Sequence, residues 1–358
     1  MGAARNGGHA GAAEGRDRRY FIAADTVDWN YIPSERNLIT GKPFTEAEDV
    51  FVKNAPDRIG PVYEKSLYRE YTDATFTTLK PRPERWQHLG MLGPVIEAEV
   101  GDTIEVTFRN NTPFPASIHA HGVFYGKDSE GAPYADGTSG AETADDAVPA
   151  GGTHVYRWQV PERAGPGPGD GSSIMWMYHS HTDEVSDTYS GLIGPMIISR
   201  KGMARKDGSP KDVDRQFVVN FMVDDENQSP YLERNVERFA PEAKSLPEAD
   251  EEFEESNLKH GINGYLFGNI PGLRMKRNET VRWYLMAMGT EVDLHTPHWH
   301  ANVVTTGPMG MRTDIVQLLP GAMVQADMHP DDPGTWLFHC HVNDHIVAGM
   351  QALYTVER

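Results

Sequence analysis

Cysteine is almost absent from this chain, which has a single one, Cys340, in 358 residues. An intrachain disulfide is therefore impossible, and the fold must be held by its apolar core and by any metal that it binds. A lone cysteine is most often a small buried residue with no further role. The neighbours of Cys340 indicate otherwise, because a histidine stands on each side of it, at His339 and His341.

Long apolar runs and positive charge are also scarce. No run reaches the length that a membrane-spanning helix needs, so no membrane span is expected. The opening stretch MGAARNGGHAGAAEG has no apolar segment of the kind that a signal peptide carries, and we expect residues 1–18 to form a disordered tail. The formal net charge of −19 disfavours nucleic acid and anionic lipid as partners, and it favours cations, including metal ions.

Helical periodicity is scarce as well. Short β-rich segments separated by Gly/Pro turns run along the chain, such as VIEAEVGDTIEVTFR from Val95 and THVYRWQV from Thr153. Several of them alternate apolar and polar residues, which is typical of half-buried strands in sandwiches or barrels. A chain of this length suits two domains of ordinary size. We expect an all-β protein with domains at 19–201 and 216–358, joined by a polar linker at 202–215.

Histidine, in contrast, is plentiful and patterned. Eight of the fifteen histidines form four His-x-His pairs, and each half of the chain has two pairs in the same order and at similar spacing. In a strand, residues i and i+2 point to the same face, so each pair presents two imidazoles to one side, as a metal site needs. The matched order predicts an internal duplication of one β-sandwich. The pairs are His119 and His121, His179 and His181, His298 and His300, and His339 and His341.

The surroundings of Cys340 indicate which metal is bound. His345 and Met350 follow it closely in the sequence, and His295 lies three residues before a histidine pair. One cysteine, two histidines and a distant methionine make the ligand set of a blue-copper centre. Zinc also binds cysteine and histidine, but it gives no reason for a thioether or for a histidine on each side of the cysteine. A redox chain does, because Cys340 can pass an electron through those two neighbours to a second cluster.

The first half of the chain lacks the corresponding blue-copper ligands. Ser180 stands where the second half has its cysteine, and Ala116 stands where the second half has His295. Between Thr182 and Leu192 there is no histidine, cysteine or methionine. We therefore expect the first domain to contribute histidines to a cluster but to hold no blue copper.

The four motifs HAHG, YHSH, HTPHWH and HCHVNDHIVAGM, in this order, resemble those of multicopper oxidases. Segments such as HLGMLGPVIEAEVGD and ESNLKHGINGYLFGN resemble ceruloplasmin and its relatives, and the resemblance runs from about Arg19 to the C-terminus. It implies a compact two-domain member of the family, built from two tandem cupredoxin domains, which are Greek-key β-sandwiches. The activity that it implies is one-electron oxidation of a reducing substrate, coupled to the four-electron reduction of O2 to water.

The resemblance also implies four copper ions per subunit and a role for each motif residue. Cys340, His339 and His341 would carry electrons from the type 1 copper to a cluster of three coppers. The type 1 copper would be bound by His295, Cys340 and His345, with Met350 as a weak axial ligand. The type 2 copper would be bound by His119 and His298, one type 3 copper by His121, His179 and His341, and the other type 3 copper by His181, His300 and His339.

In two-domain members of the family, the three-copper cluster forms between the first domain of one subunit and the second domain of the next. A head-to-tail contact of this kind closes into a ring, and the resemblance implies a homotrimer. Loading with copper requires an oxidised, copper-supplied compartment. We therefore expect the protein to work outside the cytoplasm, in the periplasm or as a secreted protein.

The substrate depends on residues outside the type 1 ligands. In ceruloplasmin-like ferroxidases, acidic residues and a histidine near that copper bind Fe(II), and the matching residues here are Glu255, His260 and Asp344. Carboxylates suit a hard divalent cation, and they favour Fe(III) over Fe(II). Glu255 can equally belong to a solvated acidic loop, and Asp344 can orient a ligand histidine. Fe(II) or another metal ion is slightly favoured over a phenol of the laccase type.

A calcium site is a further implication of the resemblance. The segment ETADD resembles a calcium loop in the first domain of ceruloplasmin, and its ligands would be Glu142, Asp145, Asp146 and the carbonyl oxygen of Lys127. Oxygen ligands suit calcium. A solvated acidic turn explains the same residues equally well.

Two rival functions remain open. A copper nitrite reductase also has two cupredoxin domains, but it needs fewer histidines and places its blue copper in the first domain, which Ser180 contradicts. A non-catalytic protein that binds or stores copper would not need the full histidine set. The sequence does not decide the physiological reductant, and it assigns no role to the segment from Tyr31 to Val62.

Overall fold

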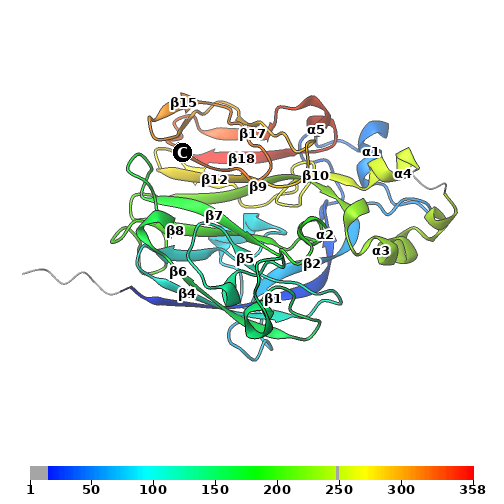
Figure 1. The fold of residues 1–358 in the computed structure, drawn as a ribbon. Helices are drawn as coiled ribbons and strands as arrows, with labels where there is room; N and C mark the ends of the chain where they lie inside the picture. Colours follow the sequence, from blue (N-terminus) through cyan, green and yellow to red (C-terminus); the bar gives the residue numbers. More distant parts are fainter. Residues whose placement is uncertain (1–14, 247–249) are drawn as a thin grey trace, which may run out of the picture.

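The computed structural model describes residues 15–246 and 250–358, and the chain forms two β-sandwiches stacked on each other (Figure 1). Most of the predicted N-terminal tail, residues 1–14, lies outside the described residues. Asp17 and Arg18, which the sequence analysis placed in that tail, already belong to the first strand. The strand that opens the second sandwich begins at Arg215, the last residue of the predicted linker.

The first sandwich contains two four-stranded sheets. Its apolar core lies between them, because the strands place apolar residues on alternate positions, as in Thr103–Asn110. One sheet has the order β2-β1-β4-β6, with β1 (Asp17–Asn30), β2 (Val62–Glu70), β4 (Thr103–Asn110) and β6 (Thr153–Gln159). The other has the order β3-β8-β7-β5, with β3 (Ile96–Glu99), β5 (His119–Ala120), β7 (Ser173–His179) and β8 (Ile193–Ser199).

The second sandwich contains a six-stranded and a four-stranded sheet around a core of its own. The six-stranded sheet has the order β10-β9-β12-β16-β14-β15, with β9 (Arg215–Asp225), β10 (Leu258–Ile262), β12 (Val281–Ala287), β14 (Val304–Thr306), β15 (Met311–Thr313) and β16 (Met323–Met328). The four-stranded sheet has the order β11-β18-β17-β13, with β11 (Arg274–Lys276), β13 (Pro297–Trp299), β17 (Gly334–Cys340) and β18 (Gln351–Glu357).

The strand pairing repeats between the two sandwiches. In the first, β1 pairs in parallel with β4 and β3 with β8; in the second, β9 pairs in parallel with β12 and β11 with β18. The strands that carry histidines correspond as well, because β5 pairs with β7 as β13 pairs with β17. Parallel pairs inside sandwiches of mostly antiparallel strands require long crossover connections, as in a Greek key. This repeat agrees with the predicted internal duplication.

Short helices decorate the sandwiches. They are α1 (Glu46–Val52), α2 (Glu184–Ser190), α3 (Leu232–Phe239), α4 (Glu251–Ser256) and α5 (Asn343–Val347), with the 3-10 turns η1 (Glu84–Leu89), η2 (Lys127–Ser129), η3 (Gly140–Thr143), η4 (Glu162–Ala164), η5 (Glu226–Gln228) and η6 (Pro241–Ser245). Within the described residues, no helix is both long and apolar enough to cross a membrane.

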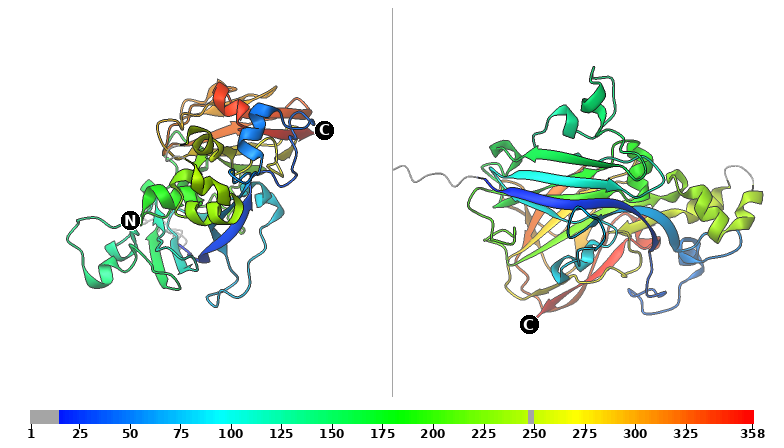
Figure 2. Two further views of the ribbon diagram at one scale, coloured as in Figure 1. Left: turned by 90° about the vertical axis from the view of Figure 1, so that its right-hand side faces the viewer. Right: turned by 90° about the horizontal axis from the view of Figure 1, so that it is seen from below.

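The segment from Tyr31 to Val62 reaches across from the first sandwich to the second. Its helix α1 starts with a capping box in which Thr45 and Glu48 bond each other's backbone N–H groups, and it packs on α4. Figure 2 shows α1 beside the second sandwich, although it belongs to the N-terminal part of the chain. Phe51 of α1 lies in one apolar cluster with Phe267 of the second sandwich. The segment therefore ties the two halves of the subunit together.

A second apolar cluster fills the contact between the sandwiches. It combines Trp86 and Met177 of the first with Val218 and Tyr284 of the second. The buried ring of His88 accepts a hydrogen bond through Nε2 from the backbone N–H of Val218, at 3.0 Å. The two sandwiches of one chain thus share a packed core, and their relative position is fixed by burial.

Candidate metal centres

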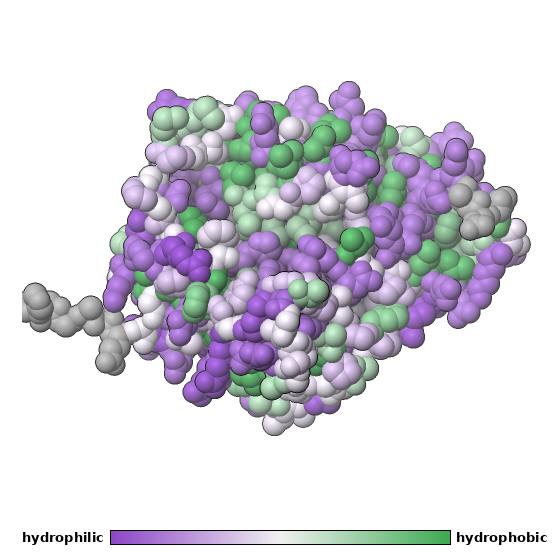
Figure 3. Space-filling model, in the orientation of Figure 1, coloured by the Kyte–Doolittle hydropathy of each residue, from purple (hydrophilic) through white to green (hydrophobic). Residues whose placement is uncertain are grey.

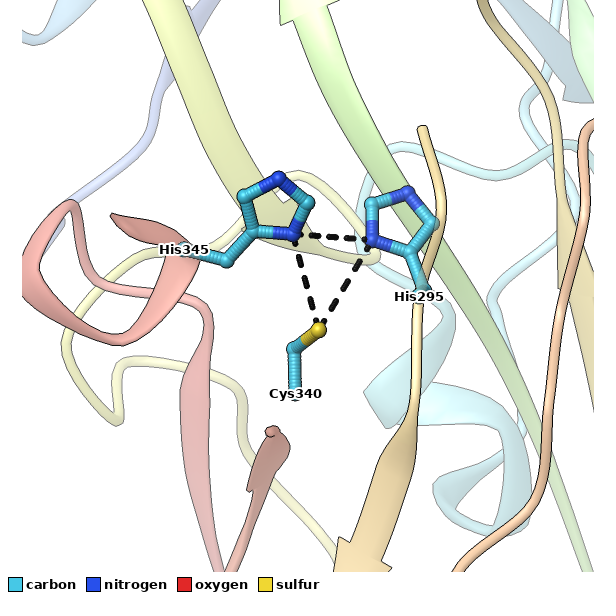
Figure 4. A group of neighbouring side chains, drawn as sticks. All are labelled: His295, Cys340 and His345. Carbon is cyan, nitrogen blue, oxygen red and sulfur yellow. Dashed lines mark hydrogen bonds between the residues drawn. The ribbon is translucent and has the colours of Figure 1, made fainter. Parts of the chain in front are cut away.

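One compact group of metal-binding side chains lies inside the second sandwich. His295, Cys340 and His345 are all buried, and their Nδ1 and Sγ atoms face one another (Figure 4). The two Nδ1 atoms are 3.2 Å apart, and Cys340 Sγ lies 3.9 Å from His295 Nδ1 and 3.5 Å from His345 Nδ1. A point equidistant from these three atoms lies about 2 Å from each, the length of a bond from a metal ion to nitrogen or sulfur.

Three segments far apart in the sequence position these ligands. Cys340 ends strand β17, His345 lies in the short helix α5, and His295 precedes β13. The backbone N–H of Cys340 donates to the carbonyl oxygen of Met350, and the N–H of Met350 donates to that of His345. Met350 is fully buried in the same core cluster as Cys340. The strand end, the helix and Met350 are therefore held together by main-chain bonds before any metal binds.

The environment of Cys340 favours the thiolate that binds metal. Burial raises the pKa of the thiol, but hydrogen bonds from His295 and His345 outweigh burial and lower the pKa to about 5. The backbone N–H of Thr296 also points at Sγ, at 3.4 Å. The sulfur is thus ready to act as a charged ligand at neutral pH.

Asp293 fixes the ring of His295, and the sequence analysis did not find it. His295 donates from Nε2 to Asp293 Oδ1 at 3.0 Å, which leaves Nδ1 free for a metal. The carboxylate is fully buried, and it also accepts the N–H groups of Val223 and Thr290. Its place two residues before a ligand histidine was the only sequence signal that could have pointed to it.

The four histidines of the first sandwich form one group. Their ring centroids lie 5.2–5.6 Å apart in the pairs that are in contact, and the Nε2 atoms of His121 and His179 are 3.1 Å apart. Burial is the main cause that lowers the pKa values of His121 and His179 to about 4. These two rings, of His121 and His179, are therefore neutral at pH 7, with lone pairs available for metal ions. We call His119, His121, His179 and His181 the first quartet.

The second sandwich carries a matching group, the second quartet, formed by His298, His300, His339 and His341. Its ring centroids lie 4.9–5.6 Å apart in the contacting pairs, and the Nε2 atoms of His300 and His339 are 3.2 Å apart. His300 and His341 are exposed, whereas His339 is buried. The pairing of β13 with β17 sets His298 opposite His339, as β5 and β7 set His119 opposite His179.

Carbonyl groups orient several of these rings. The Nδ1 atoms of His119, His298 and His339 lie 2.7, 2.9 and 2.6 Å from the carbonyl oxygens of Glu130, Asp314 and Cys340. Each of these rings therefore keeps Nε2 for a metal. The bond between His339 and the carbonyl of Cys340 also joins the quartet to the buried cysteine.

The two quartets do not meet within one subunit. Every ring contact found among the described histidines of the quartets is made inside one sandwich, and the structure shows none between the first quartet and the second. Each quartet is partly exposed at the surface of its own sandwich. The subunit therefore carries two separate groups of four imidazoles.

The residues predicted for the substrate are brought together only in part. The buried ring of His260 lies 5.2 Å from that of the ligand His345, centroid to centroid. Glu255 lies on α4 and Asp344 at the start of α5, both exposed. The metal-binding atoms of Glu255, His260 and Asp344 do not all lie within 4.8 Å of one another. His260 thus lies against the predicted type 1 ligand His345, and the two carboxylates lie outside this group.

The predicted calcium ligands show one feature that fits a cation. Asp145 is fully buried, and its Oδ1 has no hydrogen-bond partner among the described residues, while its Oδ2 accepts the N–H of Gly131. Glu142 is exposed, and the carboxylate of Asp146 has a raised pKa, mainly through burial. The ammonium group of Lys127, whose carbonyl oxygen is the predicted ligand, forms ion pairs with Glu130 and Asp136. The calcium site stays a prediction.

Comparison with known proteins identifies the class. Two family models, both described as multicopper oxidase, match residues 87–202 and 238–358. Among solved structures, the chain is similar to a multicopper oxidase with a TM-score of 0.60 at 18% identity, covering 95% of this chain and 89% of the other. It is similar to a second, mgLAC, with a TM-score of 0.59 at 18% identity, covering 95% and 86% of the two chains. The chain belongs to the multicopper oxidase family, and these structures confirm the predicted fold of two cupredoxin domains.

Its curated relatives include longer proteins. The chain is 44% identical over 343 residues to human Ferroxidase HEPHL1, which covers 95% of this chain and 29% of that protein. It is 44% identical over 348 residues to human Hephaestin (96% and 30%) and 41% identical over 350 residues to rat Ceruloplasmin (97% and 32%). The chain thus spans about a third of the length of these relatives, and the predicted resemblance to ceruloplasmin is confirmed.

Proposed function

We propose that this protein is a multicopper oxidase of the ferroxidase type, which takes single electrons from a metal ion and delivers them to O2. The group of His295, Cys340 and His345 would hold the type 1 copper, which supplies a one-electron redox step when bound. Cys340 would pass each electron to the second quartet through its neighbours His339 and His341. The bond from the Cys340 carbonyl to His339 supports this route.

We further propose that the three-copper cluster is shared between subunits of a homotrimer. The observation that carries this proposal is that the two quartets do not meet within one subunit, although each is preformed and partly exposed. One interface that brings the first quartet of a subunit to the second quartet of the next would complete the set of eight imidazoles. Because this contact is head to tail, it is satisfied at every subunit only in a closed ring.

Exposed apolar side chains beside both quartets favour a protein contact there. Phe124 follows His121 closely and Val185 follows Glu184 on α2, and each is 53% exposed. Val303 follows His300 closely and is 56% exposed. Figure 3 shows apolar residues gathered over the second sandwich, in the upper part of the view. Exposed apolar residues around a metal half-site are typical of an interface.

A complementation experiment tests the shared cluster. One variant, His119→Ala/His121→Ala, loses the first quartet, and another, His298→Ala/His300→Ala, loses the second. Each alone should be inactive in either arrangement. If the cluster is shared, co-assembled subunits should recover about a quarter of the activity of the native protein, because random mixing in a ring creates that share of intact interfaces.

The result that would reject the shared cluster is equally clear. Mixed oligomers that stay inactive, although both variants keep the blue band at about 600 nm, would mean that each cluster forms within one chain. A fully copper-loaded, active monomer in light scattering would reject the trimer directly. A native protein that shows no oxidase activity would instead contradict the oxidase proposal.

Fe(II) is the substrate that the structure supports best. His260 lies against the type 1 ligand His345, so a metal ion held there would be one ring away from the copper site. Glu255 borders two acidic hollows, one of about 680 Å³ between α1 and α4 that Glu46 and Asp49 also line. Carboxylates gathered in these hollows would attract and hold divalent cations.

Steady-state O2 consumption tests this choice of substrate. Native protein is assayed with Fe(II), Cu(I), Mn(II) and a phenol, beside Glu255→Ala and His260→Ala. Both variants should lose Fe(II) turnover by at least about tenfold and keep phenol turnover, because the copper ligands are intact. Glu233→Ala, which removes the same charge from an exposed position on α3 that lines neither hollow, is the matched control. An unchanged preference in both variants would end the ferroxidase proposal and leave a laccase.

We also propose that the protein works outside the cytoplasm, since copper loading requires an oxidised, copper-supplied compartment. Fractionation of cells that express the full-length natural protein checks this. Recovery in the cytoplasm alone would contradict it.

A further inference from the structure

The first sandwich contains a copy of the backbone that holds the type 1 ligands in the second. In the second sandwich, Cys340 N–H donates to the carbonyl of Met350, and Met350 N–H donates to that of His345. In the first, Ser180 N–H donates to the carbonyl of Leu192, and Leu192 N–H donates to that of Asp187. The distances agree to within 0.2 Å, at 3.1 and 2.9 Å in the second sandwich and 3.1 and 3.1 Å in the first.

The neighbouring strand is copied as well. Thr296 N–H points at Cys340 Sγ at 3.4 Å, and Ser117 N–H donates to Ser180 Oγ at 3.0 Å. The backbone N–H groups of His295 and Leu318 each donate to the carbonyl oxygen of the other, and those of Ala116 and Val148 do the same in the first sandwich. The helices α5 and α2 end in the same way, since Gly349 and Gly191 both have positive φ, 107° and 111°. The four type 1 ligands His295, Cys340, His345 and Met350 thus correspond to Ala116, Ser180, Asp187 and Leu192.

A hydrogen bond takes the place of the metal in this copy. Ser180 is fully buried and donates from Oγ to Asp187 Oδ2 at 2.6 Å. The same carboxylate oxygen accepts the N–H of Asp183 at 3.0 Å. Asp187 is 4% exposed, so this bond is shielded from water. Ser180 Oγ therefore both accepts from Ser117 and donates to Asp187, which joins strand, loop and helix at one atom.

The Ser180–Asp187 pair sits between two ligands of the first quartet. His179 and His181 flank Ser180 on the chain, and the N–H of His181 donates to Ser117 Oγ at 3.0 Å. The helix that Asp187 anchors carries Glu184, whose carboxylate lies 3.2 Å from Nε2 of His181. Movement of α2 or of the strand end would therefore move both imidazoles.

We propose that the Ser180–Asp187 hydrogen bond is a metal-free substitute for a type 1 centre, and that it positions His179 and His181 for the shared copper cluster. The bond locks the first sandwich as copper locks the second, because it ties the strand end to the following helix through the same backbone frame. Ser180 and Asp187 are positioning residues in this scheme, since they act only through the flanking histidines. The inference rests on the proposed copper cluster.

Asp187→Ala and Asp187→Asn test the bond as a matched pair. Asparagine can place its carbonyl oxygen where Oδ2 lies and keep both donors, whereas alanine loses both and leaves the buried Ser180 hydroxyl without an acceptor. In the metal-loaded protein, Asp187→Ala should weaken retention of the cluster coppers by at least about tenfold against a chelator, and Asp187→Asn should keep it near the native value. Retention is followed by copper content and by the near-ultraviolet absorption of paired coppers.

The blue band provides an internal control, because all type 1 ligands lie in the second sandwich. A variant that keeps this band at about 600 nm and loses only the cluster coppers supports the proposal. A folded Asp187→Ala protein that keeps its cluster as tightly as Asp187→Asn overturns it. A native protein with no paired-copper absorption would instead contradict the proposed oxidase.

A second variant tests directly whether the backbone around Ser180 is equivalent to the backbone around Cys340. Ala116→His, Ser180→Cys, Asp187→His and Leu192→Met together restore the type 1 ligand set in the first sandwich. The structure predicts one additional copper per subunit and roughly a doubling of the blue absorbance at about 600 nm. A folded quadruple variant that binds no additional blue copper would contradict the claim that a hydrogen bond stands in a metal's place.

Discussion

Asp293→Asn tests how a buried carboxylate controls the proposed type 1 site. Asp293 Oδ1 accepts from His295 Nε2 at 3.0 Å and from Val223 N at 2.7 Å, and its Oδ2 accepts from Thr290 N at 2.9 Å. Asparagine can keep its oxygen toward His295 and Val223, but its amide nitrogen then faces the N–H of Thr290. Two donors then face each other, one of them on the fully buried side chain at position 293, which should cost about 1–3 kcal/mol of folding free energy.

The loss of negative charge acts separately on the metal. Partners of ligand histidines contribute tenfold to a hundredfold in metal affinity, so Cu(II) should bind the variant about 10–100 times more weakly. Because the lost charge favours Cu(II) over Cu(I), the reduction potential of the type 1 copper should rise. Glu291 is exposed and stands two residues before Asp293. Glu291→Gln removes the same charge there, and it should change neither the Cu(II) affinity nor the reduction potential.

Two measurements separate these effects. Thermal unfolding of the metal-free proteins reports the folding cost, and titration with Cu(II) against a chelator, followed at about 600 nm, reports the affinity. A variant whose Cu(II) affinity and potential match those of the native protein would refute the assignment of His295 as a ligand held through Nε2 by Asp293.

Burial lowers the pKa of His88 to about 3, against 6.5 for an exposed histidine. Between these two pH values the unfolded chain binds a proton that the folded protein does not bind. The free energy of unfolding of the metal-free protein should therefore fall as the pH drops from about 6.5 towards 3, by up to about 1.4 kcal/mol per pH unit. His88→Gln, whose amide oxygen can still accept from Val218, should show a shallower slope in denaturant unfolding at several pH values, and equal slopes would contradict this account. The fully buried Lys65 bonds to Glu226 and to the carbonyl of Tyr189, so Lys65→Met should cost about 3–5 kcal/mol by leaving a buried carboxylate uncompensated. Adding Glu226→Gln should recover most of the loss in denaturant unfolding, and no recovery would mean that packing of the lysine stem dominates.

Much of the metal chemistry could be predicted because it depends on local spacing. A strand places residues i and i+2 on one face whatever the rest of the fold does, so each His-x-His pair was predicted as two ligands on one side. The same rule puts the side chain of Cys340 on the face opposite His339 and His341, and the structure indeed shows it with His295 and His345. The carboxylate of Asp293 carried no such pattern, and neither did the bridging role of Tyr31 to Val62.

The substrate residues show where local pattern ends. Glu255, His260 and Asp344 were predicted together from resemblance, yet among them only the ring of His260 is found against a proposed type 1 ligand, His345. The positions of Glu255 and Asp344 depend on how α4 and α5 pack on the second sandwich, which no short motif encodes. Helix α1 comes from a segment some two hundred residues earlier in the chain and still lines the same acidic hollow as Glu255.

By itself, the sequence determined which side chains can bind metal and which of them share a face, because strand geometry converts spacing into direction. It also determined that one half lacks the blue-copper ligands, because Ser180 and Ala116 cannot bind copper as cysteine and histidine do. Only the tertiary structure decided that the two quartets stay apart within one subunit. It alone also decided that a hydrogen bond from Ser180 to Asp187 joins the strand end to α2 in the first sandwich. These features depend on which distant surfaces pack together, and that outcome follows from burial over the whole chain and not from any local pattern.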